Sequence, residues 1–133
     1  MKKILFLSIL FHSSFLFGQI KNIRNYQENI NNAELSLIAG NKSIAFNEYY
    51  TTLIKSEGNF CKDIYNAMLL ATELTKKDTF FVFLNLLTTK GLTNSYINGL
   101  TEFSQFHKDP KWIAFLKDNQ NYNAIFVPCG GGG

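Results

Sequence analysis

The chain has 133 residues, of which 46% are hydrophobic and 17% are charged, and its formal net charge is +3. This composition is too apolar for a disordered tail, and two cysteines are too few for a disulfide-dense scaffold. Lys2 and Lys3 supply two of the positive charges, so the rest of the chain carries no electrostatic footprint for nucleic acid. The length suits one domain or a few stacked repeats.

Residues 1–18 are predicted to be a secretory signal peptide. Lys2 and Lys3 form a short positive segment, and residues 4–17 form an apolar run that is shorter than the roughly 20 residues of a membrane-spanning helix. Gly18 offers a small residue before the cleavage bond, which predicts Gln19 as the mature N-terminus. The alternative is a buried N-terminal helix. With a signal peptide, the protein would be exported to the periplasm or the medium, with no stable membrane insertion after cleavage.

Residues 19–120 are predicted to form an all-α domain of about six helices, because no stretch alternates strictly between apolar and polar residues. The first two helices are expected over residues 20–39 and 42–56. Gly40 separates them, since glycine adopts the left-handed conformation that ends many helices. Their expected apolar faces are Ile23, Tyr26, Ile30, Ala33 and Leu37, then Ile44, Ala45, Tyr49, Thr52 and Leu53.

The next two helices are expected over residues 60–74 and 79–90. Ala67 and Ala71 are small, which favours close approach of a neighbouring helix. Asp78 is the predicted N-cap of the second of these helices. That helix is apolar almost all round, so it is expected at the centre of the core.

A shorter helix is expected over residues 93–103, and a last helix opens at Asp109 and Pro110. Aspartate is a favoured N-cap, and proline is favoured at the first helical position. The side chains expected to point inward are Tyr96, Ile97, Leu100 and Phe103, then Trp112, Ile113, Phe115 and Leu116.

Short turns between the helices predict antiparallel hairpins, with the first two turns at residues 40–41 and 77–78. The turns lie 37 residues apart by position, which indicates a helical repeat. Repeats of about 34 residues are typical of tetratricopeptide arrays, and those of other helical solenoids are about 40 or longer.

The segment from Ala33 to Tyr49 is similar to a tetratricopeptide repeat at its turn, with Gly40-Asn41 followed by Ala45. The run F-H-K-D-P-K-W at residues 106–112 resembles the motif that ends such arrays. The style of the signal also resembles that of exported Bacteroidetes-type proteins. The resemblance implies a short solenoid of stacked hairpins that binds a protein or peptide and is not an enzyme. The first repeat departs from the family pattern, because no proline closes it.

The residues offer little chemistry beyond this scaffold. A nucleophile pair of Cys61 and His107 is conceivable, but no third group that would orient it is identifiable, and local packing of the histidine is the simpler interpretation. After removal of residues 1–18, two cysteines and one histidine, His107, remain at wide spacing and match no closed zinc site. We therefore expect no catalytic, cofactor-binding or metal-binding residues.

Residues 121–133 are predicted to form an extended Cys-Gly tail that ends in four glycines. Cys61 and Cys129 would form a disulfide after export, closing a loop that in the chain-entropy model stabilises the fold by about 4 kcal/mol. The alternative is a buried cysteine at a helix start and a free cysteine in a frayed tail.

Two functions follow from these features. The first is an exported scaffold that binds an unidentified protein or peptide, with Tyr26, Tyr49 and Tyr50 as exposed aromatic candidates for its groove. Tyr49 could instead belong to the core. The second is a precursor or substrate whose Cys-Gly tail is modified or cleaved.

Overall fold

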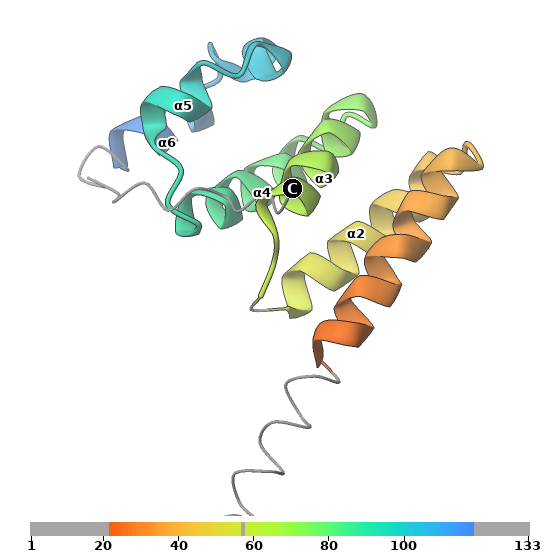
Figure 1. Ribbon diagram of the computed structural model, residues 1–133. Coiled ribbons are helices and arrows are strands. Elements are labelled where there is room, and N and C mark those ends of the chain that lie inside the picture. Colours follow the sequence, from red (N-terminus) through yellow and green to blue (C-terminus); the bar gives the residue numbers. More distant parts are fainter. Residues whose placement is uncertain (1–21, 57, 119–133) are drawn as a thin grey trace, which may run out of the picture. The chain divides into compact units, whose positions relative to one another are not determined.

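The computed structural model describes residues 22–56 and 58–118 (Figure 1). Every regular element in these residues is a helix, which confirms the predicted all-α class. The chain divides into two compact units at Gly58 and Asn59, and each unit is described by itself. Within the described residues, no helix has the length and apolarity needed to cross a membrane.

The first unit is a helical hairpin, formed by a helix over residues 22–38 and by α2 (Lys42–Lys55) (Figure 1). The buried apolar residues recur every three to four positions, as expected for one face of each helix. They are Tyr26, Ile30 and Ala33 on the first helix and Ala45, Phe46, Tyr49 and Leu53 on α2. Ile23, Leu37 and Ile44, which were expected on these faces, are exposed, so these three predictions were wrong.

The turn of this hairpin follows the prediction. Gly40 has a φ of +79°, the left-handed conformation that glycine adopts without steric penalty. The amide of Asn41 donates to the carbonyl of Ser36 at 2.9 Å, and the amide of Gly40 donates to that of Leu37 at 3.0 Å. These two bonds form a Schellman motif, which satisfies carbonyls that the helix end leaves without partners.

The second unit contains α3 (Cys61–Glu73), α4 (Lys77–Thr89), α5 (Asn94–Asn98), the 3₁₀ helix η1 (Thr101–Phe106) and α6 (Pro110–Asp118). α3 and α4 pack against each other as a second hairpin. Ala67 and Ala71 are fully buried, as expected for close helix approach. The other buried apolar residues of the two helices are Ile64, Met68, Leu70, Phe80, Phe83, Leu84 and Leu87.

The end of α3 repeats the turn of the first hairpin without a glycine. Thr75 has a φ of +58°, the only positive φ of a non-glycine residue in the described chain. The amide of Lys76 donates to the carbonyl of Ala71 at 2.8 Å, and that of Thr75 donates to Thr72 at 3.2 Å. This is again a Schellman motif. The equivalent turn residues are therefore Gly40 and Thr75, 35 positions apart rather than the predicted 37.

The predicted start of α4 was wrong. The helix begins at Lys77 with Lys76 in the N-cap position, and Asp78 lies in the first turn. Its carboxylate accepts a hydrogen bond from the Lys111 ammonium at 2.6 Å. Asp78, which was expected to cap the helix, thus pairs with Lys111, a residue distant in the sequence.

A single helix over residues 93–103 was also predicted wrongly. α5 ends at Asn98, and the chain passes through Gly99 into the separate helix η1. The hydroxyl of Thr93 accepts from the amide of Tyr96 at 3.2 Å and caps α5. Tyr96 itself is 55% exposed rather than inward, whereas Ile97 is buried as expected.

The last helix begins as predicted. α6 starts at Pro110, and the carboxylate of Asp109 accepts from the amide of Lys111 at 2.8 Å. Trp112 and Phe115 are buried, but Ile113 is 58% exposed, contrary to expectation.

Phe80 is the centre of an aromatic core that joins α4 to the end of the second unit. Its ring is stacked 4.1 Å from Phe106 and lies edge-on to Phe103 at 5.1 Å. Trp112 is stacked against it at 6.3 Å. Aromatic pairs at these separations stabilise a core beyond the area that they bury. α4 therefore supplies the core as predicted, although Val82 on its outer face is exposed.

Candidate functional site

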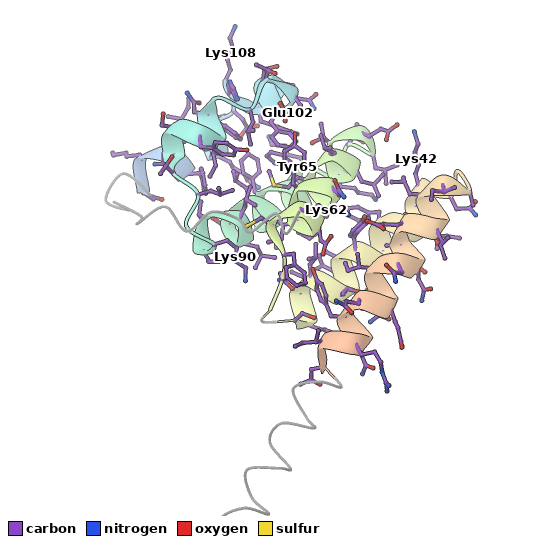
Figure 2. The ribbon with its side chains drawn as sticks, viewed as in Figure 1. Lys42, Lys62, Tyr65, Lys90, Glu102 and Lys108 are labelled. Carbon is purple, nitrogen blue, oxygen red and sulfur yellow. The ribbon has the colours of Figure 1, made fainter. Side chains whose placement is uncertain are left out.

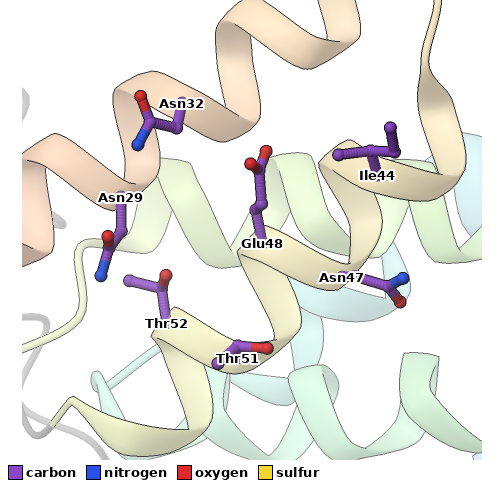
Figure 3. A pocket seen from close by; sticks show the side chains of 7 residues that line it. All are labelled: Asn29, Asn32, Ile44, Asn47, Glu48, Thr51 and Thr52. Atoms are coloured by element: carbon purple, nitrogen blue, oxygen red, sulfur yellow. The ribbon is translucent and has the colours of Figure 1, made fainter.

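The first hairpin carries a polar groove between its two helices (Figure 3). Its volume is about 320 Å³, and all its lining residues belong to the first unit. We call it the amide groove, because three of its side chains are carboxamides. It is lined by Asn29, Asn32, Ile44, Asn47, Glu48, Thr51 and Thr52.

Helical spacing brings the polar side chains of the amide groove together. Asn29, Asn32 and Ser36 lie three and four residues apart on the first helix, so they share one face. Glu48 and Thr52 are likewise one turn apart on α2. Figure 3 shows the two asparagines on one side of the groove and Glu48 on the other.

One hydrogen bond fixes the acid of the amide groove. The hydroxyl of Ser36 donates to Oε2 of Glu48 at 2.9 Å, across the two helices. A carboxylate has about four acceptor positions, so one hydroxyl leaves Glu48 able to accept further N–H groups. Each carboxamide nearby can both donate and accept. The groove is thus equipped to pair with a ligand that presents amide groups.

Five polar positions of the first hairpin have buried, apolar counterparts in the second. A shift of 35 residues, set by Gly40 and Thr75, aligns the two hairpins. It pairs Asn29, Asn32, Ser36, Glu48 and Thr52 with Ile64, Ala67, Ala71, Phe83 and Leu87, all of which are buried. Part of a helix face that is core in the second hairpin is therefore polar in the first, where Asn29, Asn32, Glu48 and Thr52 line the amide groove.

A second hollow, of about 270 Å³, lies in the second unit beside the start of α3. We call it the Cys61 groove. It is lined by Cys61, Lys62, Tyr65, Leu87, Leu92 and Tyr96. The hydroxyl of Tyr65 donates to the carboxylate of Glu102, and Figure 2 shows the two side chains pointing toward each other. The ring of Tyr65 also packs edge-on against Phe103 at 5.7 Å, which fixes that wall of the groove.

Two ion pairs join the start of α4 to the start of α6. Lys77 pairs with Asp109, and Lys111 pairs with Asp78 at 2.6 Å. The hydrogen bond and charge of Lys111 hold the pKa of Asp78 below its ordinary 3.8, and Lys77 lowers the pKa of Asp109 chiefly through its hydrogen bond. The hydrogen bond to Asp78 raises the pKa of Lys111 above 10.5. These ion pairs hold α6 to α4, and neither of them lines one of the two grooves.

The aromatic binding candidates do not form a common exposed surface. Tyr26 and Tyr49 are buried, so their assignment as exposed aromatics was wrong, and the alternative that Tyr49 belongs to the core is confirmed. Tyr50 is 41% exposed and stacks at 6.4 Å on Phe46. None of the three lines the amide groove. The residues that do line it include asparagines that recur at helical spacing in the sequence. The prediction relied on aromatic residues and did not use this signal.

The remaining predicted residues are placed as follows. His107 packs its ring on Trp112 at 4.7 Å, as the local-packing interpretation expects. Cys61 is disulfide-bonded, so its sulfur is not a thiol that a histidine could activate. Gly18, Gln19 and Cys129 lie outside the described residues. The cleavage site and the pairing of Cys61 with Cys129 therefore stay predictions.

Comparison of the chain with models of known protein families, with curated proteins and with solved structures found no match. A search of the described residues for three or more histidine, cysteine or acidic side chains arranged to hold a metal ion also found none. The two grooves are therefore the features of the described residues that indicate a function.

Proposed function

We propose that this chain is an exported helical-repeat scaffold that binds an extended segment of a protein or peptide and catalyses no reaction of its own. The observation that carries the proposal is the amide groove, a hollow of about 320 Å³ lined by three asparagines, two threonines and a glutamate. The 35-residue spacing of the two hairpins is close to the roughly 34 residues of tetratricopeptide repeats, which supports a scaffold of that type.

The chemistry of the amide groove favours a peptide backbone as its ligand. An extended peptide presents an N–H and a C=O at each residue, and no secondary structure of its own satisfies them. The carboxamides of Asn29 and Asn32 can each donate to a carbonyl and accept from an amide. Glu48 adds a negative charge, which favours a segment with a lysine or arginine near the groove.

Binding can be tested with a random library of partners. A phage library that displays random 12-residue peptides is panned on the full-length protein, and enriched peptides are measured by fluorescence anisotropy. Asn32→Ala should weaken binding by about tenfold, as expected for the loss of one hydrogen bond of about 1.4 kcal/mol. Glu48→Gln keeps an acceptor for Ser36 but removes the charge, so it should weaken chiefly the peptides that contain lysine or arginine.

Asn31→Ala is the matched control. Asn31 is on the same helix as Asn32 and is exposed, but it does not line the amide groove. It should bind the enriched peptides as the unchanged protein does, and circular dichroism should show equal helix content for all variants. If Asn32→Ala and Glu48→Gln bind as tightly as the control, the amide groove is not the peptide site.

Export is tested separately by the intact mass of the protein recovered from cells. A mass that starts at Gln19 supports removal of residues 1–18. A mass that starts at Met1 contradicts it.

A further inference from the structure

The Cys61 groove combines apolar walls with a disulfide-bonded sulfur. Among its lining residues, Leu87 is buried, Leu92 is half-buried, and Tyr96 is 55% exposed. Cys61 lines the same hollow and carries a disulfide bond. The sequence contains only one other cysteine, Cys129, near the end of the chain.

The last described helix, α6, is tied to the chain beside this groove. The carboxamide of Asn94 donates to the carbonyl of Leu116 at 2.8 Å and ties the last turn of α6 to the start of α5. Asn94 stands between Leu92 and Tyr96, two walls of the groove. Asp118, the last described residue, follows only two positions after Leu116. The last described residue therefore lies near one side of the groove, while Cys61 is part of its lining.

The length of the segment allows it to cross the groove. Cys129 lies eleven positions after Asp118, and an extended chain spans at most about 3.3–3.6 Å per residue, or about 40 Å in all. A hollow of about 270 Å³ is small enough for an extended chain of this length to cross it. A disulfide requires Cα atoms only about 4.4–6.8 Å apart, so Cys129 would lie directly beside Cys61.

The composition of the segment suits the groove walls. Residues 122–127 read Y-N-A-I-F-V, of which only the asparagine is not apolar. No charged residue occurs between Asp118 and Gly133. Burial of such side chains against Leu87, Leu92 and Tyr96 would remove apolar surface from water on both sides.

We propose that residues 122–127 of this chain occupy the Cys61 groove and that a Cys61–Cys129 disulfide holds them there as a redox-sensitive latch. A dithiol reductant breaks the latch: the S–S bond accepts two electrons and two protons, both cysteines become thiols, and the dithiol becomes a disulfide. The released segment leaves the groove, and the four-glycine end moves with it. The latch is independent of peptide binding at the amide groove of the other unit.

Hydrogen exchange of the full-length protein tests the latch. In the oxidised protein, the amides of residues 123–127 should exchange at least tenfold more slowly than after treatment with dithiothreitol. Cys129→Ser should give the fast exchange without reductant, because it removes the bond from the tail and leaves α3 unchanged. Peptide mapping without reduction should recover one linked pair that contains residues 61 and 129 from a monomeric protein.

Tyr96→Asp tests the contribution of the groove wall while the disulfide stays intact. An acid in the wall of the groove should speed exchange of residues 123–127 about tenfold while peptide mapping still finds the disulfide. Ile113→Asp is the matched control, because Ile113 is 58% exposed in the same unit and does not line the groove. It should leave the exchange of the segment unchanged.

Three results would overturn the proposal. Exchange of residues 123–127 at the rate of an unstructured peptide in the oxidised protein would show that they do not occupy the groove. Protection that survives both dithiothreitol and Cys129→Ser would show that the disulfide is no latch. A Cys61–Cys129 link found between two chains, with a dimer mass before reduction, would assign the groove to a second copy.

Discussion

The two hairpins carry different residues at equivalent positions. The first hairpin has Asn29, Asn32 and Glu48, and the second has Ile64, Ala67 and Phe83, which are buried. The two hairpins share the same turn, in which a left-handed residue closes a Schellman motif. They differ in the burial and polarity of the residues on the equivalent helix face. One hairpin uses it to build a core, and the other lines a hollow with amides and hydroxyls.

The two hairpins therefore share the backbone geometry of their turn but differ in the polarity of the side chains on an equivalent helix face. Terminal units of stacked repeats need a polar outer face, because no neighbour covers it. Such a face can be a solubilising end or a binding groove, and the helix backbone is the same in both cases. The second unit has an aromatic core around Phe80, so we expect it to carry most of the stability of the described chain.

The largest test of this comparison is Phe80→Ala. Removal of a fully buried phenylalanine should lower the free energy of unfolding by about 3–5 kcal/mol, from lost burial and the cavity left behind. Trp112, the single tryptophan, contacts the ring, so its fluorescence reports urea unfolding of this unit. Val82→Ala, on the exposed side of α4, should change the midpoint much less. Equal effects of the two variants would contradict an aromatic core centred on Phe80.

A change in the first hairpin probes the smaller core. Ala45 is fully buried at the position that corresponds to Phe80, so Ala45→Leu should overpack the hairpin and lower its stability by about 1–3 kcal/mol. Loss of helical circular dichroism should precede the change in Trp112 fluorescence if the two units unfold separately. Ser43→Leu, at an exposed position of the same helix, is the control. An unchanged midpoint for Ala45→Leu would show that this core is loosely packed.

The shared turn gives a pair of substitutions with opposite expected signs. Gly40→Ala forces an L side chain into the left-handed region and should destabilise by about 1 kcal/mol, although a Cβ there meets no atom within 4 Å. Thr75→Gly relieves a β-branched residue that also has a left-handed φ and should stabilise by about 0.5–1 kcal/mol. Thermal unfolding of both variants measures the effects. Stabilisation by Gly40→Ala would show that the two turns are not equivalent.

The smallest expected effect comes from the ion pairs of the second unit. The folded-state pKa values of Asp78 and Asp109 lie below the ordinary 3.8, so these acids stabilise the fold above that pH. The contribution is lost as the pH falls through the lowered values. Asp78→Asn should therefore reduce the pH dependence of the unfolding midpoint below pH 4. An unchanged acid profile would mean that the pair with Lys111 adds nothing in solution.

A matched pair of substitutions separates charge from capping at Asp109. Asp109→Asn keeps an acceptor for the amide of Lys111 but loses the pair with Lys77, whereas Asp109→Ala loses both. The alanine variant should melt at the lower temperature of the two. Equal melting temperatures would assign the whole effect to the charge.

Prediction of the candidate site from the sequence was weaker than prediction of the fold. Exposed tyrosines were expected to form the groove, but Tyr26 and Tyr49 are buried and the hollow is lined by amides. A tyrosine on an apolar helix face fits a core as well as a binding surface, and the sequence does not say which neighbour covers it. The recurrence of Asn29, Asn32 and Ser36 at helical spacing was visible, but on its own it is also typical of a solvated face.

Features that depend on near neighbours could be predicted from the sequence. Helical periodicity predicted an all-α chain, Gly40 predicted the left-handed turn, and Asp109 with Pro110 predicted the start of α6. Each of these results from hydrogen bonds and backbone sterics within a few residues.

Only the tertiary structure decided where distant groups meet. Asp78 pairs with Lys111, 33 residues away, instead of capping its own helix. The ring of Phe80 gathers Phe103, Phe106 and Trp112 into one core, although a break at Gly99 interrupts the helix predicted there. Burial and long-range pairing depend on which surfaces the folded chain brings together, and local sequence preferences do not contain that information.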